Sequence, residues 1–191
     1  MRFNANKCAF RVGAGKFLGY LINDRGIEDN LNQIEVMKRL KPPSNLKEVQ
    51  VLTDMLATLN QFISKFADRY HPLYQLLKMW KGFQWSEECE KAFQDLKEYL
   101  VWAPMLTAPE LREDLFMYLS VSEHTMSAML IRDQGVQQPV YYVSKTLTDA
   151  ETRYLPLKKL ELALVHTTRK LPHYFQAHTV YVLIFPNSYP L

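Results

Sequence analysis

The spacing of apolar residues changes near residue 105, and this change most constrains the fold. Before it, apolar residues recur every three or four positions, which is typical of one buried helix face. An example is the run Val49, Leu52, Leu56 and Leu59. After it, short apolar runs bounded by turn residues are typical of β-strands. We therefore predict an α+β protein in two parts, residues 1–104 and 105–191.

The first part begins with residues typical of a β-hairpin. Residues 8–12 and 17–22 predict two strands, and the glycine-rich residues 13–16 between them predict the turn. Gly19 inside the second strand indicates a bulge or the close approach of another backbone. A second turn is predicted at residues 23–26.

Helices are predicted for the rest of this part. Asn30 is expected to begin the first, with Ile34, Met37 and Leu40 at helical spacing before the stop at Pro42 and Pro43. Asn45, with Glu48 three residues later, predicts the start of a second helix. Further helical segments are expected at residues 62–66 and 73–79. A last helix is expected to begin at Ser86, and its predicted buried face consists of Ala92, Phe93, Leu96, Tyr99 and Leu100.

The second part has the predicted order βββαβ. Residues 115–120, 127–132 and 140–144 are expected to be strands, with a turn at residues 133–135. A helix is predicted from residue 155 to 170, and residues 179–185 form the last predicted strand. The predicted buried residues of the helix are Leu157, Leu160, Leu164 and Leu171.

Several strings resemble, in the same order, the pol region of gypsy-class LTR retrotransposons, particularly plant ones. Lys16-Phe17-Leu18-Gly19-Tyr20 resembles the end of the reverse-transcriptase palm, and Pro139-Val140-Tyr141-Tyr142-Val143-Ser144-Lys145 resembles the ribonuclease H core. Strings at residues 7–10, 47–53, 59–63, 83–93 and 154–165 resemble the palm end, the thumb helices, the connection and the ribonuclease H core. The resemblance implies a palm-end hairpin, a helical thumb and connection, and an incomplete ribonuclease H-like unit.

The sequence departs from this family at every catalytic carboxylate. The family is an RNA-directed DNA polymerase and ribonuclease H, and both activities use Mg²⁺ held by carboxylates. The polymerase motif Tyr-x-Asp-Asp is missing, since no two aspartates are adjacent. The ribonuclease H positions are matched by Ser120, Lys158 and Phe185, whose side chains do not provide the anionic oxygens that Mg²⁺ prefers. We therefore predict a catalytically inactive fragment that binds no metal or other cofactor.

Two other functions stay open. Glu123, near the first strand, and Glu161, one turn beyond Lys158, are candidate displaced carboxylates for a ribonuclease acting on RNA–DNA hybrids. The other function is a nucleic-acid-binding or interaction module, because the family's thumb grips a duplex. The resemblance implies contacts to nucleic acid by Phe17, Leu18, Gly19, Tyr20, Lys65, Arg69, Lys78 and Lys81. A net charge of +3 favours only weak, salt-sensitive binding to an RNA–DNA or DNA duplex.

Other classes of protein are disfavoured. No apolar run is long enough to span a membrane, and no secretory signal is recognisable, so we expect a soluble intracellular chain. Cys8 and Cys89 show no paired spacing, and the five histidines fit no metal-ligand pattern. Since the family's ribonuclease H fold continues past its fourth strand, we expect dependence on a missing part of the polyprotein or on a partner chain.

Overall fold

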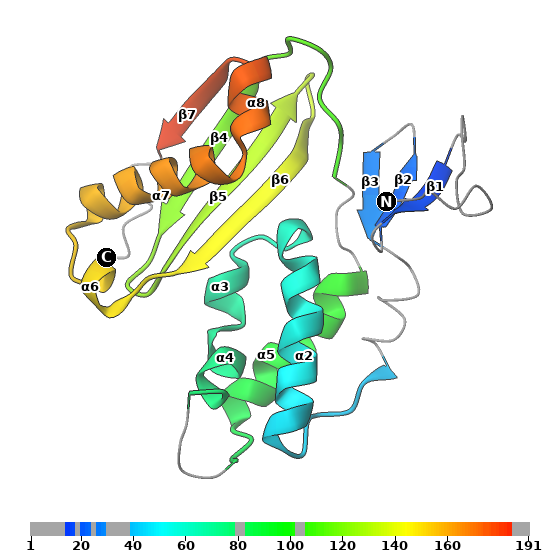
Figure 1. Ribbon diagram of the computed structural model, residues 1–191, viewed down its shortest axis with the longest axis vertical. Coiled ribbons are helices and arrows are strands. Elements are labelled where there is room, and N and C mark those ends of the chain that lie inside the picture. The colour runs from blue at the N-terminus through cyan, green and yellow to red at the C-terminus, as the bar shows by residue number, and fades with distance from the viewer. Residues whose placement is uncertain are drawn as a thin grey trace, which may run out of the picture.

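The protein contains two sheets, with a group of helices between them in the chain (Figure 1). The computed structural model describes residues 14–17, 20–23, 26–29, 39–78, 83–101 and 106–184, and only the backbone of the first three segments. Within these residues no helix is long and apolar enough to cross a membrane. The α+β class predicted from the sequence is confirmed.

The N-terminal sheet is antiparallel, and its turns differ from those predicted. Its strands, in the order β1-β2-β3, are β1 (Ala14–Phe17), β2 (Tyr20–Asn23) and β3 (Gly26–Asp29). The predicted turn at residues 13–16 is wrong, because most of it is strand β1. The predicted strand at residues 17–22 is also wrong, because Phe17 pairs with Tyr20 and the chain reverses between them. Pairing with the neighbouring strand outweighs the local turn preference of glycine here. Asn23 pairs with Gly26, as the turn predicted at residues 23–26 requires, and residues 24 and 25 lie outside the described residues.

The helices form a unit of their own. They are α2 (Leu46–Leu59), the 3-10 helix η2 (Asn60–Phe62), α3 (Phe66–Arg69), α4 (His71–Leu76) and α5 (Glu87–Val101). The Asn45 side chain caps α2 by accepting a hydrogen bond from the Glu48 amide at 3.0 Å. The Glu48 carboxylate accepts one from the Ser44 amide, a residue earlier than in a capping box. The hydroxyl of Ser86 accepts from the Cys89 amide and caps α5 as predicted.

Helices α2 and α5 supply most of the first core. The predicted stripe on α2 is buried, together with Ala92, Phe93, Leu96 and Leu100 of α5, while Tyr99 is half-buried. The helix predicted at residues 62–66 is wrong. Ile63 has an extended backbone, and Lys65 has a positive φ of 51°, so both break helical geometry. Helix α4 begins and ends earlier than the predicted segment 73–79, and Met79 lies outside the described residues.

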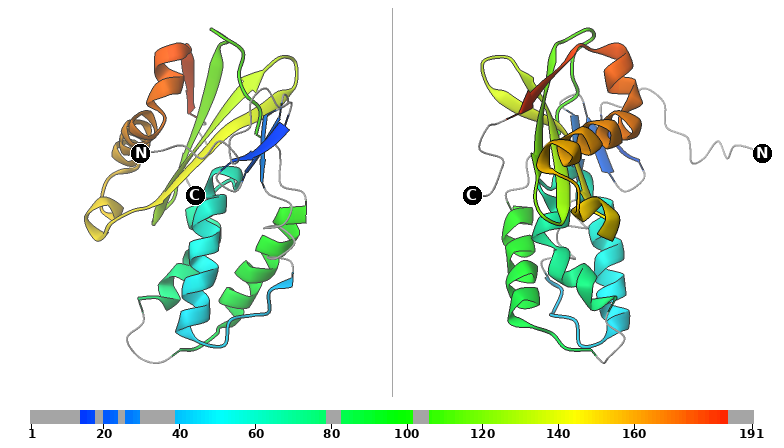
Figure 2. Two further views of the ribbon diagram at one scale, coloured as in Figure 1. Left: turned by 45° about the vertical axis from the view of Figure 1, so that its right-hand side comes forward. Right: turned by 90° about the vertical axis from the view of Figure 1, so that its left-hand side faces the viewer.

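The second sheet carries α7 across one face (Figure 2). Its strands are β4 (Leu115–Val121), β5 (Thr125–Asp133), β6 (Gln137–Thr146) and β7 (Val180–Ile184), in the order β6-β5-β4-β7. Only the β4–β7 pair is parallel. The connection from β6 to β7 contains α6 (Asp149–Thr152), α7 (Pro156–Lys170) and α8 (Pro172–Ala177). The predicted order βββαβ is confirmed.

Helix α7 covers the second core with a slightly different face from the one predicted. Leu160 and Ala163 are buried against β4, and Leu171 is also buried, whereas Leu164 is half-buried. Leu157 was predicted to be buried, but it is 61% exposed. The inward position in this first turn is taken by Lys159, a residue that hydrophobic periodicity cannot select.

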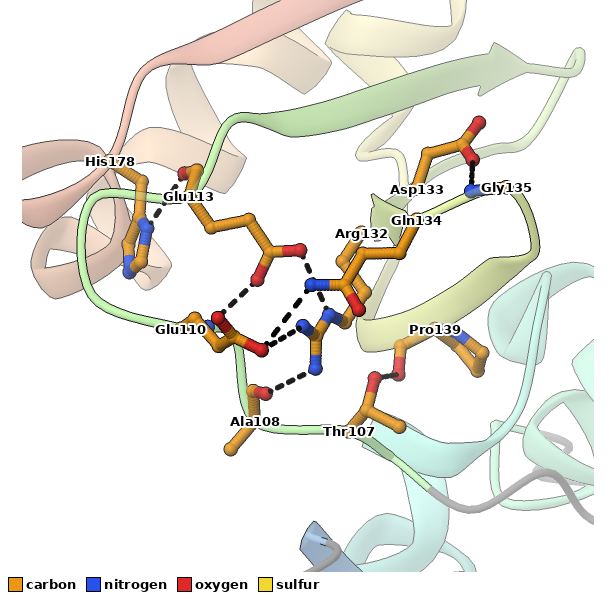
Figure 3. Close-up of polar contacts among 10 residues, drawn as sticks. All are labelled: Thr107, Ala108, Glu110, Glu113, Arg132, Asp133, Gln134, Gly135, Pro139 and His178. Atoms are coloured by element: carbon orange, nitrogen blue, oxygen red, sulfur yellow. Dashed lines mark hydrogen bonds and ion pairs between the residues drawn. The ribbon is translucent and has the colours of Figure 1, made fainter.

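An ion-pair network fastens the segment before β4 to the end of β5 (Figure 3). The guanidinium of Arg132, which is 9% exposed, donates to the carboxylate of Glu113 at 3.0 Å, to that of Glu110 at 3.2 Å and to the Ala108 carbonyl at 3.1 Å. The imidazole Nδ1 of His178 is 2.9 Å from the Glu113 carbonyl and donates to it. The network therefore links the segment that enters β4 to the segment that enters β7.

Replacing Arg132 with methionine tests this network. The change leaves the largely buried Glu113 carboxylate without its cation, so we expect a loss of about 3 kcal/mol of unfolding free energy in a denaturant titration. Glu110→Gln is the matched control, because this side chain is 74% exposed and its ion pair contributes at most about 1 kcal/mol. Equal effects of the two substitutions would contradict the burial argument.

Candidate functional site

Ser120, which the sequence predicts at the family's first carboxylate position, lies near the end of β4. Ser120 pairs with Ser127 of β5, and Ser127 pairs with Ser144 of β6. Paired residues face the same side of a sheet, so three hydroxyls form a row across the strands. Leu119 pairs with Ile184 of β7, the last described pair in that register, and Phe185 lies outside the described residues. Of the predicted catalytic positions, Ser120 therefore lies near the end of β4.

Lys158 belongs to the same end of the molecule but is turned to solvent. Its ammonium lies 4.4 Å from the centre of the Tyr154 ring, a cation–π contact. Within the described residues no hydrogen bond joins Lys158 to Ser120. Lys158 lies in α7, as the predicted helix at residues 155–170 implies, but it is not the cation that contacts the strand end.

Lys159 is the residue that reaches the end of β4, and the sequence analysis did not identify it. It is 7% exposed, and its ammonium donates to the carbonyls of Ser122 at 3.3 Å and Glu123 at 2.9 Å. A buried ammonium is costly unless acceptors replace its water, and these two carbonyls do so. Lys159 therefore fixes the turn between β4 and β5, residues 122–124, to helix α7.

The helical unit contacts the same β4–β5 turn from another side. The carboxylate of Asp68, in α3, accepts from the hydroxyls of Ser122 and Thr125, both at 3.3 Å. The Ala67 amide donates to the Ser144 hydroxyl at 2.9 Å. The hydroxyls of Ser122, Thr125 and Ser144 thus take part in hydrogen bonds between the helical unit and the sheet.

An apolar cluster lies beside these hydrogen bonds. Phe62 of η2, Leu106 and Tyr142 of β6 are buried together, with Met129 packed against them. Burial raises the pKa of the Tyr142 hydroxyl to about 12, so it stays neutral at physiological pH. The contact between the helices and the sheet is therefore both apolar and polar.

Two histidines stack at the edge of this contact. The rings of His71 in α4 and His124 in the β4–β5 turn lie 5.8 Å apart and almost parallel, at 3°. Burial lowers the pKa of His71, and the nearby His124 and Lys78 lower it further, while Asp68 opposes them. The folded chain therefore favours the neutral form of His71 more than the unfolded chain does.

The carboxylates proposed as displaced ligands do not gather. The side chain of Glu123 is 82% exposed and lies 3.9 Å from the His124 imidazole. Glu161 is exposed on α7. Among the residues that the structure describes, no three His, Cys, Asp or Glu side chains form a group that could hold a metal ion. The polar side chains at this end of the sheet are hydroxyls, the Lys159 ammonium and one carboxylate, Asp68, which already accepts two hydrogen bonds, and this set does not fit Mg²⁺.

The residues predicted to contact nucleic acid differ in their exposure and in whether their charge is paired. Lys65 and Lys78 are exposed. Arg69 is paired with Asp95 at 3.2 Å and lies 5.0 Å from the Tyr99 ring, so its charge is already partnered. Phe17 and Tyr20 pair across the first hairpin, whereas Leu18, Gly19 and Lys81 lie outside the described residues. Their role in binding stays a prediction.

The class of protein follows from an α+β fold whose second sheet has the order βββαβ, with α7 on one face. Residues 85–182 match the family described as the RNase H-like domain found in reverse transcriptase. The match covers more than half of the chain, so the chain belongs to this family.

The chain is also similar to transposon polyproteins. The transposon Tf2-3 and Tf2-4 polyproteins of Schizosaccharomyces pombe are each 27% identical to the chain over 176 residues. These matches cover 91% of this chain but only 13% of each polyprotein. The predicted resemblance to an LTR retrotransposon pol polyprotein is confirmed.

Solved structures share the fold. The foamy viral protease-reverse transcriptase in complex with an RNA/DNA hybrid superposes with a TM-score of 0.78 and 23% identity, over 94% of this chain and 25% of that one. The same viral protein in complex with dsDNA gives 0.75 and 23%, over 97% of this chain and 40% of that one. The arrangement of helices and sheet is therefore that of a reverse transcriptase.

The adjacent lysines of α7 provide a matched test of the strand-end contact. Lys159→Met removes the donor to two carbonyls, so we expect it to cost about 2 kcal/mol of unfolding free energy in urea. Lys158→Met changes an exposed side chain and is expected to stay within about 0.5 kcal/mol of the unsubstituted chain. A larger effect at Lys158 would mean that the wrong lysine has been assigned to the turn.

The histidine stack predicts a pH dependence. The pKa of His71 is lower in the folded chain than in the unfolded chain, where it is about 6.5. The contribution of neutral His71 to the free energy of unfolding is therefore complete above about pH 6.5 and is lost as the pH falls below it. We expect His71→Gln to reduce the loss of unfolding free energy between pH 7.5 and pH 5. His173→Gln, at an exposed position in α8, is the control, and identical losses in both variants would contradict the account.

Proposed function

We propose that this chain is a non-catalytic reverse transcriptase/RNase H-like unit of a retrotransposon polyprotein. In this proposal the end of the sheet that carries metal ligands in the family serves instead to join the helices to the sheet. One observation carries the proposal: the Lys159 ammonium is bound to the carbonyls of Ser122 and Glu123, immediately after β4. A fixed cation at this place repels a divalent metal ion.

The hydroxyls at this end support the same proposal. Ser144 accepts a hydrogen bond from the Ala67 amide, and Ser122 and Thr125 donate to Asp68. Asp68 is thus a carboxylate near the strand end, but it is used by two hydroxyls. Recruiting it to a metal ion would break the hydrogen bonds that join α3 to the β4–β5 turn.

The proposal includes the division of the chain at residues 104 and 105. Two separate buried clusters support it, one within the helices and one between α7 and the second sheet. The contact between the two units contains Phe62, Leu106 and Tyr142. A separate buried core in each part is typical of two structural units in one chain.

A further part of the polyprotein, or a partner chain, is proposed to cover the edge of β7. Within the described residues β7 pairs only with β4, and its side chains Tyr181, Val182 and Ile184 are 49%, 38% and 50% exposed. An uncovered strand edge with apolar side chains favours pairing with another segment.

Cleavage of a labelled RNA–DNA hybrid tests the lack of catalysis. The purified chain, shown to be folded by its cooperative unfolding, is incubated with the hybrid and Mg²⁺ or Mn²⁺. We expect no cleavage above a metal-free sample, because the carboxylates needed to hold two metal ions do not converge.

The double variant Glu123→Gln/Glu161→Gln is the control for this experiment. It removes both candidate displaced carboxylates and should behave like the unsubstituted chain. Cleavage that stops with a chelator and is lost in the double variant would replace the proposal with that of a displaced-carboxylate ribonuclease.

Binding to a nucleic-acid duplex is the second candidate function. Two solved structures with this fold were obtained in complex with an RNA/DNA hybrid and with dsDNA. Exposed Lys65 and Lys78 offer charges for phosphate contacts in the predicted thumb. Such binding is expected to be weak and to fall steeply with salt concentration.

A further inference from the structure

The positive charge of this protein is concentrated in one short stretch. Residues 153–178 contain five lysines and arginines and one glutamate, a formal surplus of four positive charges. The whole chain has a net charge of +3, so everything outside this stretch carries one net negative charge. The helical segment 39–101, predicted to be the thumb, contains nine basic and eight acidic residues. The cationic surface therefore lies elsewhere than the sequence resemblance predicts.

Lys159 faces the sheet, but the fold leaves other cations of this stretch on the outside of helix α7. Leu160, Ala163 and Thr167 face the sheet, so the opposite face of the helix is turned to solvent (Figure 2). Lys158 and Arg169 are eleven residues apart, and eleven residues are close to three helical turns, so both lie on this outer face. Arg153 is exposed just before the helix begins.

These side chains keep their charge available. Within the described residues Arg153, Lys158 and Arg169 form no ion pair, whereas Arg69, Arg132 and Lys145 are each paired with a carboxylate. The only acidic residue in the stretch is Glu161. Arg169 also lies in the last turn of α7, where a cation stabilises the helix dipole without losing its exposure.

We propose that the outer face of α7, with Arg153, Lys158 and Arg169, binds the phosphate backbone of a nucleic-acid duplex. This inference rests on the duplex-binding function proposed above and assigns the surface that carries it. Lys158 and Arg169 are about 16 Å apart along the helix axis, and this distance matches about five phosphates of one strand measured along the duplex axis. Contacts of this kind position a protein on a duplex but read no sequence.

Exposed apolar residues on the same helix would favour a different partner, an acidic protein surface. Leu157 is 61% and Val165 is 44% exposed, and both lie between the cations. An acidic protein surface could use these side chains, whereas a phosphate backbone uses only the charges. Competition between a duplex and an acidic polypeptide therefore distinguishes the two partners.

The salt dependence of duplex binding tests the proposal. Binding of a 20-base-pair DNA duplex is measured at several salt concentrations for the whole chain and for Lys158→Gln/Arg169→Gln. The slope of log K against log salt is negative, and each lost phosphate contact makes it shallower by about 0.9. We therefore expect the slope of the double variant to be shallower by about 1.8. The matched control Lys47→Gln/Lys91→Gln removes two exposed lysines of the helical unit that belong to neither surface, and it should keep the slope of the unsubstituted chain. Lys65→Gln/Lys78→Gln, in the predicted thumb, is the comparison variant.

The outcomes separate this inference from the function on which it rests. A slope made shallower only by Lys65→Gln/Lys78→Gln would overturn the α7 surface and leave duplex binding to the predicted thumb. No binding by the folded chain at low salt would overturn duplex binding and the α7 surface together. Displacement of the duplex by an equal charge concentration of polyglutamate would assign the surface to acidic proteins and overturn the proposal.

Discussion

A buried ammonium must find acceptors for its protons, and the arrangement of this protein at the end of β4 follows from that requirement. Lys159 satisfies it with the carbonyls of Ser122 and Glu123, which belong to the turn between two central strands. The helix is thereby fixed to the turn, and the turn is fixed to both strands. Because the cation lies at the strand end, that position suits an anion or a dipole rather than a second cation.

The same turn also determines how the helices contact the sheet. Asp68 accepts hydrogen bonds from Ser122 and Thr125, and the ring of His71 stacks on that of His124. Any change that moves the turn therefore affects the contact with α7 and the contact with the helical unit together. The β4–β5 turn is thus the place where the helical unit, α7 and the second sheet meet.

Much of this fold was predictable from the sequence, because hydrophobic periodicity reports burial directly. The α2 stripe, the caps at Asn45 and Ser86 and the order βββαβ were all predicted correctly. The first hairpin was not, since its register depends on pairing between strands rather than on local turn preference. Lys159 was also missed. No pattern in the sequence separates it from Lys158, and only the position of the β4–β5 turn decides which of the two lysines is buried.

The central claim is that the end of the second sheet is a structural junction and not a metal site. Nuclear magnetic resonance with Mn²⁺ tests it most directly, because a bound paramagnetic ion broadens the signals of nearby amides. We predict no saturable broadening at the amides of Ser120, Ser122 and Glu123 when Mn²⁺ is titrated into the folded chain. Saturable broadening confined to these amides and to the first turn of α7 would contradict the account.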